Sequence, residues 1–133
     1  MLLTKKSEYA LLSLVIIAKS KQPKNVETLS TELNISKSFL AKILQNLAKN
    51  EILNSFKGNN GGFTLKKSCE ELTILEVTKI AEEKTPAVFE CTASGTCSGN
   101  ISACSVFPLL NNLQNKINYF LDELTLKDIL ENK

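Results

Sequence analysis

One short segment of this chain strongly favours a tight turn. Residues 58–62 read Gly-Asn-Asn-Gly-Gly, and Gly and Asn adopt the positive φ angles of hairpin turns more readily than other residues. The flanking runs 52–57 and 63–67 have the length and composition of short strands. The sequence therefore predicts a two-stranded hairpin in the middle of the chain.

Three helices are expected before this hairpin. Thr4 can cap a helix over residues 4–20, and a shorter helix follows over about 25–33. Ser36 is a natural N-cap for a third helix over about 37–50. The apolar stripe of this third helix consists of Leu40, Ile43, Leu44 and Leu47. Three helices followed by a hairpin is the order of a winged helix-turn-helix, in which the third helix enters the DNA major groove.

Positive charge is concentrated on the third helix and the hairpin. The chain has 16 Lys, no Arg and 14 acidic residues. Residues 36–67 hold six Lys and one Glu, a net charge of +5, whereas residues 68–133 hold five Lys and ten acids, a net charge of −5. A basic block on the two elements that would face DNA favours nucleic-acid binding over a merely solvated surface.

We expect DNA contacts from the polar side of the third helix and from the hairpin. The candidate contact residues are Ser38, Ala41, Lys42, Gln45, Lys57, Asn59 and Asn60. Lys can donate to guanine edges but lacks the planar fork of Arg. We therefore expect weaker direct readout of bases and more reliance on phosphate contacts and DNA shape.

The composition argues against an enzyme and against a membrane protein. The chain has no His, which removes the usual general base, the Ser–His–Asp triad and zinc sites that need imidazole. The apolar run at residues 14–18 is too short to cross a bilayer, and no signal-peptide cleavage site follows it. We therefore expect a cytoplasmic binding protein with no membrane partner.

A long C-terminal helix is expected over residues 105–124. Its apolar residues are spaced 4, 3, 4, 3 and 4 apart, a heptad pattern formed by Val106, Leu110, Leu113, Ile117, Phe120 and Leu124. Leu109 and Leu121 widen this stripe, as in a helix that packs on its own domain. We nevertheless expect a homodimer through this helix, which would present two heads to a palindromic operator of double-stranded DNA.

The expected fold class is mainly α, a winged helix-turn-helix with a small two-stranded wing and a long C-terminal dimerisation helix. We divide the chain into a DNA-binding domain at 1–83, a cysteine loop at 84–104 and a C-terminal part at 105–133. Two further helices should begin at Thr73 and Thr125, each with an acidic residue three positions on, the spacing of a capping box.

Three cysteines lie in the loop, at Cys91, Cys97 and Cys104. Thiols this close can converge on one metal centre. Zinc is disfavoured because structural zinc usually takes four ligands from Cys-x2-Cys pairs, which this chain lacks. Iron–sulfur clusters accept more variable spacings, and a reversible disulfide between two of the three thiols is the open alternative.

The loop offers three thiol ligands, so a fourth ligand must come from elsewhere. Cys69 directly follows the hairpin, and we expect it to be a small buried hydrophobe. A carboxylate could complete the site, and Glu8 is the candidate because it is an acid on a helix that otherwise faces the body.

Several segments together resemble the IscR/NsrR (Rrf-two) family of bacterial winged-helix regulators. They are residues 3–5, 8–11, 38–44, 57–65, 72–74 and 124–130, together with the three cysteines. The resemblance spans essentially the whole chain. It implies a DNA-binding homodimer whose cysteines hold a 2Fe–2S or 4Fe–4S iron–sulfur cluster. It also implies that cluster loss or damage changes DNA affinity, in response to nitric oxide, redox stress or iron–sulfur status.

This chain departs from parts of the family pattern. IscR-like members carry a His three residues after the third Cys, where this chain has Phe107. NsrR-like members instead use an acidic residue from the partner's first helix, and Glu8 falls at that place. The recognition helix has Ala41-Lys42 where IscR-like members tend to have Glu-Gln, and Lys57 stands where an Arg is common in the wing of the family. These differences favour an NsrR-like repressor, with a cluster-free thiol/disulfide redox-switch transcription factor as the alternative.

Overall fold

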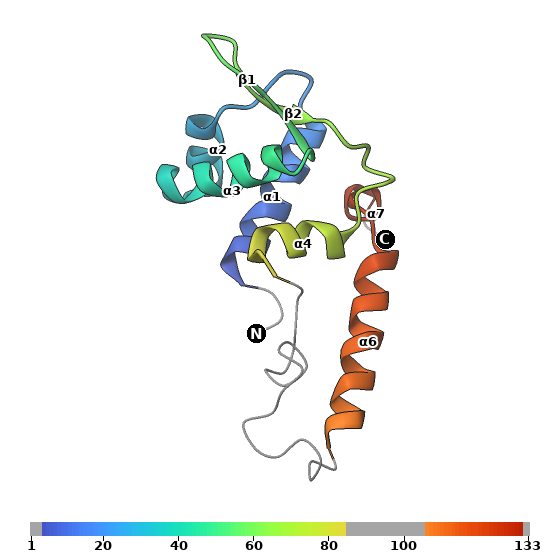
Figure 1. Ribbon diagram of the computed structural model, residues 1–133. Helices are drawn as coiled ribbons and strands as arrows, with labels where there is room; N and C mark the ends of the chain where they lie inside the picture. The colour runs from blue at the N-terminus through green and yellow to red at the C-terminus, as the bar shows by residue number, and fades with distance from the viewer. Residues whose placement is uncertain (1–3, 85–105, 132–133) are drawn as a thin grey trace.

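The computed structural model describes residues 4–84 and 106–131 (Figure 1). Helices dominate these residues, and their one sheet has two antiparallel strands. In chain order the elements are α1 (Lys5–Lys19), α2 (Val26–Leu33), α3 (Lys37–Lys49), β1 (Leu53–Phe56), β2 (Gly62–Leu65), α4 (Ile74–Glu82), α6 (Phe107–Glu123) and α7 (Leu126–Leu130). The expected mainly α winged helix-turn-helix is confirmed.

Side-chain caps begin most of the helices where the sequence predicted. The Thr4 hydroxyl accepts from the Lys6 amide at the start of α1, and the Ser36 hydroxyl accepts from the Phe39 amide at the start of α3. Thr125 and Asp128 form the full reciprocal capping box of α7. These caps satisfy backbone amides that have no partner inside the helix.

The cap of α4 differs from the expected capping box. The Thr73 hydroxyl accepts from the Glu76 amide as predicted. The Glu76 carboxylate, however, accepts two hydrogen bonds from Lys67 Nζ, at 2.6 and 2.8 Å. A charged partner outcompetes a backbone amide for the carboxylate. This ion pair connects the end of the wing to the first turn of α4.

The turn between α2 and α3 is short because a single residue reverses the chain. Asn34 caps the C-terminus of α2 with φ 56° and ψ 50°, and its amide donates to the Ser30 carbonyl. Asn tolerates this left-handed conformation better than most residues. Ser36 begins the next helix two residues later, so the helix-turn-helix geometry is set locally.

The wing is a hairpin in which Leu53 pairs with Leu65 and Phe56 pairs with Gly62. Lys24 adds a third segment to it, because its backbone exchanges hydrogen bonds of 3.1 and 2.8 Å with Phe63. No pattern in the sequence predicted this bridge. It attaches the loop between α1 and α2 to the base of the wing.

The glycines of the turn are required for two different reasons. Gly58 and Gly62 have φ angles of 105° and 146°, whereas Asn59 and Asn60 do not have positive φ. A Cβ on Gly62 would lie 2.6 Å from the Lys24 carbonyl carbon, and one on Gly61 would lie 2.4 Å from the Phe56 carbonyl oxygen. The hairpin prediction is therefore confirmed, although glycine and not Asn supplies the positive φ angles.

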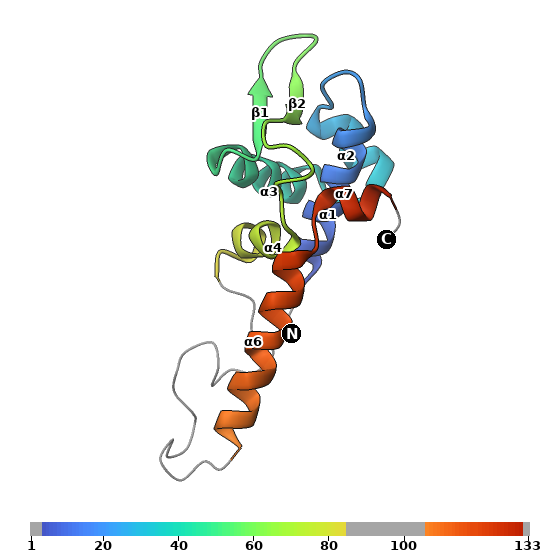
Figure 2. The same cartoon turned by 90° about the vertical axis from the view of Figure 1, so that its right-hand side faces the viewer.

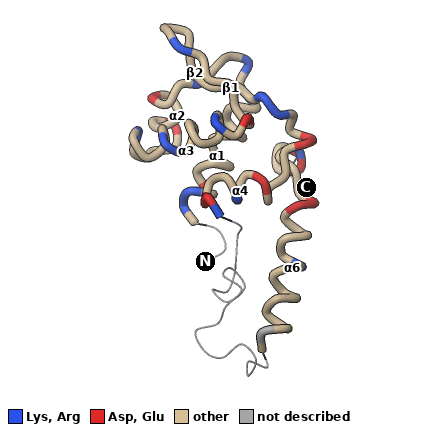
Figure 3. Tube along the Cα trace, in the orientation of Figure 1, with Lys and Arg blue, Asp and Glu red and all other residues tan. Residues whose placement is uncertain are grey.

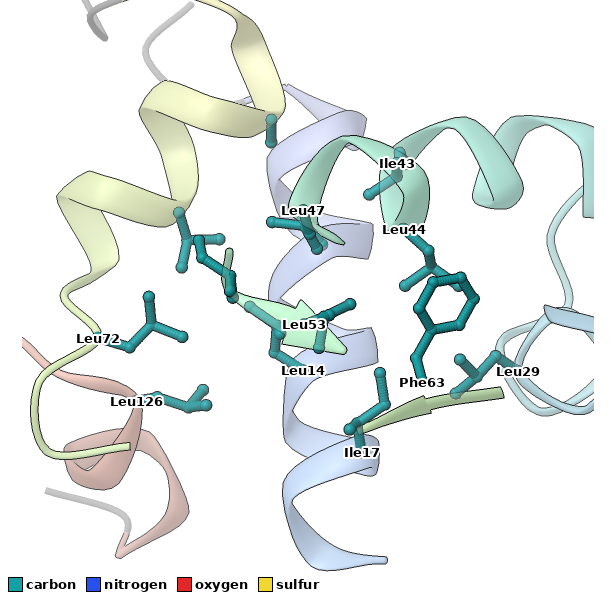
Figure 4. Close-up of a cluster of buried hydrophobic side chains, with 14 of the residues drawn as sticks. Leu14, Ile17, Leu29, Ile43, Leu44, Leu47, Leu53, Phe63, Leu72 and Leu126 are labelled. Carbon is teal, nitrogen blue, oxygen red and sulfur yellow. The ribbon is translucent and has the colours of Figure 1, made fainter. Parts of the chain in front are cut away.

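The predicted apolar stripe of α3 lies at the centre of one hydrophobic core (Figure 4). Its four residues are buried, and they pack with side chains from α1, α2, α4, the wing and α7. The core residues labelled in Figure 4 include Leu14, Leu29, Leu44, Leu47, Leu53, Phe63, Leu72 and Leu126. We call residues 4–82 together with α7 the head.

The residues that follow α6 pack against the head and form backbone hydrogen bonds with it. The Ile74 amide donates to the Leu124 carbonyl at 2.8 Å, and the Leu126 amide donates to the Leu72 carbonyl at 2.9 Å. The Leu126 side chain is fully buried. The C-terminal end of α6 is thereby held beside the start of α4.

The rest of α6 extends away from the head (Figure 2). Leu121 is buried where α6 packs against α4. Among the heptad residues, Leu113 is 41% and Phe120 is 60% exposed. Leu109 and Tyr119 are also exposed, so α6 carries an apolar surface that the described part of the chain leaves uncovered.

We expect Gly62→Ala to lower the free energy of unfolding by about 1–3 kcal/mol, because it adds both φ strain and a backbone clash. Gly58→Ala is the matched control: its φ is also positive, but nothing lies within 4 Å of the added Cβ. Urea unfolding followed by circular dichroism measures both. Equal losses of stability in the two variants would contradict the role of the Lys24 contact.

Candidate DNA-binding surface

One face of α3 is turned to solvent and carries polar side chains. Ser38, Lys42 and Gln45 are all exposed, and their spacing of four and three residues places them on one side of a helix. Ala41 is half-buried at the edge of this face. Of the predicted helix contacts, the structure thus brings three together and places the fourth beside them.

One residue of this face was missed among the predicted contacts. Lys49 is exposed and continues the same face four residues after Gln45. The helical spacing that begins at Ser38 could have identified it. We call Ser38, Lys42, Gln45 and Lys49 the reading face.

Hydrogen bonding and packing fix the orientation of the reading face. The buried stripe on the opposite side of α3 holds the helix against the core. Asn46 Nδ2 donates to the Ile80 carbonyl oxygen of α4 at 2.8 Å. The rings of Phe39 and Tyr9 meet edge to face, with centroids 5.9 Å apart. These contacts tie both ends of α3 to neighbouring helices.

The wing places its predicted contact residues at the far end of the head. Lys57, Asn59 and Asn60 are exposed at the tip, above α3 in the view of Figure 1. The two Asn residues border a polar hollow of about 600 Å³ whose other side is formed by Gln22, Pro23 and Asn25. The tip therefore presents amide and ammonium donors.

Figure 3 marks the positions of the lysines and the acidic residues along the chain. The six lysines of the basic block do not contribute equally to the positive surface. Three are paired with acids: Lys37 with Glu27 at 4.0 Å, Lys66 with Glu51 at 3.3 Å, and Lys67 with Glu76 at 2.6 Å. The other three have no acidic partner within 4.0 Å among the described residues, and they are Lys42, Lys49 and Lys57.

The unpaired charge therefore lies on the reading face and the wing tip. An acid 3–4 Å away cancels much of the potential that a lysine projects to a distant anion. Residues 36–67 have a net charge of +5, but three of their ammonium groups have no acidic partner among the described residues. These three groups lie on the two elements that the sequence predicted to contact DNA.

The candidate cluster ligands are only partly within the described residues. Cys91, Cys97 and Cys104 lie outside them. Glu8 is exposed in the first turn of α1, with its carboxylate 3.2 Å from Lys5 Nζ. Within residues 4–84 and 106–131, no three Cys, Asp or Glu residues are grouped to hold a metal ion. Glu8 is accessible, and a carboxylate can join thiolates in binding iron.

Cys69 has the surroundings expected from the sequence, though with more exposure. Its thiol is free and half-buried, and the side chain packs against the hydrophobic core. Its carbonyl accepts a hydrogen bond from the Lys127 amide. The residue therefore contributes to the joint between the wing and α7.

The last turn of α4 is bonded to the first turn of α1. The Glu82 carboxylate accepts hydrogen bonds from the hydroxyls of Ser7, at 2.9 Å, and Thr4. Partial burial raises the pKa of Glu82, but these hydrogen bonds lower it by more, so the pKa lies below its usual value of 4.5. A lowered carboxyl pKa stabilises the folded state above the unfolded pKa, and this stability is lost as the pH falls through the folded value.

We expect Glu82→Gln to lower the free energy of unfolding at pH 7 by about 0.5–1 kcal/mol, since solvent screens a half-buried group. The difference from the unaltered protein should shrink as the pH falls below 4.5, where Glu82 itself becomes protonated. Urea unfolding at pH 7 and at lower pH measures it. Glu83→Gln, which changes the adjacent exposed carboxylate, is the control, and an equal effect of both variants would contradict the Glu82 contacts.

None of the helices in the described residues has both the length and the apolar character needed to span a bilayer.

Comparison with known proteins gives consistent results at the levels of family, sequence and fold. A family model described as "Rrf2: Iron-dependent Transcriptional regulator" matches residues 3–132. The HTH-type transcriptional regulator IscR of Escherichia coli strain K12 is 28% identical over 135 residues, which cover 100% of this chain and 82% of that protein.

Solved structures similar to this chain include those of CymR and IscR proteins. One is CymR, described as the global cysteine regulator of B. subtilis, with a TM-score of 0.79, 18% identity and coverage of 100% and 98% of the two chains. Another is T. potens IscR, with a TM-score of 0.74, 16% identity and coverage of 99% and 88%. At these identities the likeness shows the fold.

The family match covers nearly the whole chain and agrees with the helix-turn-helix, the wing and the exposed lysines described above. The sequence predicted a regulator rather than an enzyme and a resemblance to the Rrf-two family, and both predictions are confirmed. The chain belongs to the Rrf2 family of winged-helix transcriptional regulators.

Proposed function

We propose that this regulator is a homodimeric repressor whose operator affinity is controlled by an iron–sulfur cluster. The ligands would be Cys91, Cys97 and Cys104 of one subunit and Glu8 of the partner subunit. The observation that carries the DNA-binding part is the position of the unpaired lysines on the reading face and the wing tip.

In this proposal α3 lies in the major groove. Ser38 and Gln45 can donate to base edges, and Lys42 can donate to a base edge or to a phosphate. The small Ala41 side chain allows close approach or contact with a thymine methyl group. Lys57, Asn59 and Asn60 of the wing would contact a neighbouring groove or the phosphate backbone.

The exposed apolar side of α6 supports a homodimer. Phe120 and Leu113 are large, exposed and separated by one heptad, and a contiguous apolar surface of this kind is unusual on a monomer. Pairing two copies of α6 would bury it and place two heads on one palindromic operator.

The donor set supports an iron–sulfur cluster with mixed ligands. The spacing of the three cysteines, without the Cys-x2-Cys pairs of structural zinc sites, favours iron over zinc, and Phe107 stands where the IscR-like pattern has its His ligand. When bound, the cluster would supply iron that reacts with nitric oxide and oxidants, with a carboxylate-ligated corner that exchanges more readily than a thiolate. Glu8, exposed on α1, is available to a second subunit.

The last turn of α4 offers a route from the cysteine segment to the reading face. That segment begins shortly after Glu82, which bonds to α1. The Ile80 carbonyl, one half-turn earlier, accepts from Asn46 of α3. A restraint on the cysteine segment would therefore act directly on the two helices that hold the reading face.

A cluster-free redox switch is the second candidate. Similarity to CymR, including a structure described as the oxidized form of Staphylococcus aureus CymR (TM-score 0.78, 20% identity, coverage of 98% and 97%), favours it. A disulfide between two of the three loop cysteines would restrain the same segment without iron.

Anaerobic purification should yield a brown protein with iron and acid-labile sulfide. Cys97→Ala should lose the colour and the iron, whereas Cys69→Ala, the matched control, should keep both. Absorption spectra with iron and sulfide counts make the measurement. A colourless, iron-free protein that forms a Cys–Cys bridge after mild peroxide would establish the redox switch instead.

Cluster control of DNA binding predicts that Cys97→Ala and the anaerobic holo-protein differ in operator affinity. The operator would first be selected from random duplex DNA with the holo-protein. Fluorescence anisotropy then compares the two proteins at one salt concentration. Equal affinities would defeat the proposed control.

Lys42→Gln should reduce the salt dependence of DNA binding more than Lys66→Gln. Lys66 is paired with Glu51, whereas Lys42 has no acidic partner among the described residues. Removing one phosphate contact lowers the slope of log K against log salt by about 0.9, or by roughly 2 for a dimer. Titrations with nonspecific duplex DNA at several salt concentrations test this. Equal slopes for the two variants would show that pairing does not select the contacting lysines.

A further inference from the structure

The first turn of α1 lies beside the reading face, on the side of α3 away from the wing. Figures 1 and 2 both show the wing at one end of the head and the start of α1 below α3. A hollow of about 200 Å³ separates these elements, and both Lys6 of α1 and Lys42 of α3 line it. This position adjoins the surface assigned to DNA, and Lys42 is the one predicted contact residue among those that line it.

The hollow contains two unpaired cations. Lys6 and Lys42 have no acidic partner within 4.0 Å among the residues that the structure describes. The neighbouring Lys5 differs, because its ammonium group pairs with Glu8. Among the described residues, Glu83 supplies the one carboxylate that lines the hollow, so the lining side chains carry an excess of one positive charge.

The walls of the hollow are held in place by the core and by hydrogen bonds. Phe39 packs on Tyr9, Ile43 is buried, and Asn46 is bonded to the Ile80 carbonyl. Thr4 and Ser7, on either side of Lys6, both donate to Glu82. Lys6 therefore projects from a fixed helical turn.

The size and charge of the hollow suit a single phosphate group. A helix in the major groove has a phosphate backbone along each edge. The wing is positioned to meet one edge. The first turn of α1, on the other side of α3, is positioned to meet the opposite edge.

We propose that a phosphate of the DNA backbone enters this hollow and is held between the ammonium groups of Lys6 and Lys42. The inference rests on the proposed DNA-binding function and adds α1 as a third contacting element. Because Glu82 accepts hydrogen bonds from Thr4 and Ser7, which lie in the same turn as Lys6, the last turn of α4 sets the position of this contact.

The test compares Lys6→Gln with Lys116→Gln. Lys116 is likewise exposed and without an acidic partner within 4.0 Å among the described residues, but it lies on α6, which extends away from the head (Figure 2). Lys6→Gln should lower the salt slope for duplex DNA by roughly 2 per dimer, as expected when each subunit makes one phosphate contact fewer. Lys116→Gln should leave the slope unchanged, and circular dichroism melting should show that both variants fold.

A third variant tests the opposite charge. Glu83→Gln removes the carboxylate from the hollow and should tighten DNA binding at low salt, an effect that Lys6→Gln in the same chain should cancel. A loss of affinity in Glu83→Gln would contradict the proposal.

The remaining outcomes separate this inference from the function on which it rests. If the unaltered protein binds duplex DNA and Lys42→Gln weakens binding while Lys6→Gln does not, the phosphate site is wrong and the proposed function stands. If the unaltered protein binds no DNA, the proposed function itself fails. A further outcome is that, in calorimetry, Lys6→Gln abolishes the binding of inorganic phosphate while the salt slope for DNA stays unchanged. In that case the hollow binds a free anion and the proposal is overturned.

Discussion

Burial of one side of α3 is the interaction on which the rest of the structure depends. Leu40, Leu44 and Leu47 are completely buried, and each contributes about 2 kcal/mol through removal of apolar surface from water. A rotation of α3 about its axis would expose these side chains. The same packing therefore stabilises the head and turns the reading face outward.

The features that depend on local spacing could be predicted from the sequence. The stripe of α3, the Ser36 cap and the Thr125–Asp128 capping box each involve residues within a few positions of one another. The wing could be predicted because its turn needs glycine at positions where another residue would be strained or would clash with the backbone. Such features need only the period of a helix or the steric limits of a turn.

The features that depend on distant residues could not be predicted. The Lys24–Phe63 bridge and the hydrogen bonds from α1 to Glu82 join residues about 40 and 75 positions apart. The pairing of lysines also depends on the fold, so a count of charges identified the basic region but not its unpaired members. Lys6 stood outside the basic block and was therefore overlooked. The ligand roles of the three loop cysteines stay a prediction.

The two candidate switches differ in chemistry but would act through one structural joint. Either an iron–sulfur cluster or a disulfide would restrain the segment that follows α4. The last turn of α4 is bonded to α3 through Asn46 and to α1 through Glu82. A small displacement of this turn would move Lys42 and Lys6 relative to each other, and the two ammonium groups can hold one phosphate only at a fixed separation. DNA affinity would then respond to the state of the cysteines through this phosphate contact.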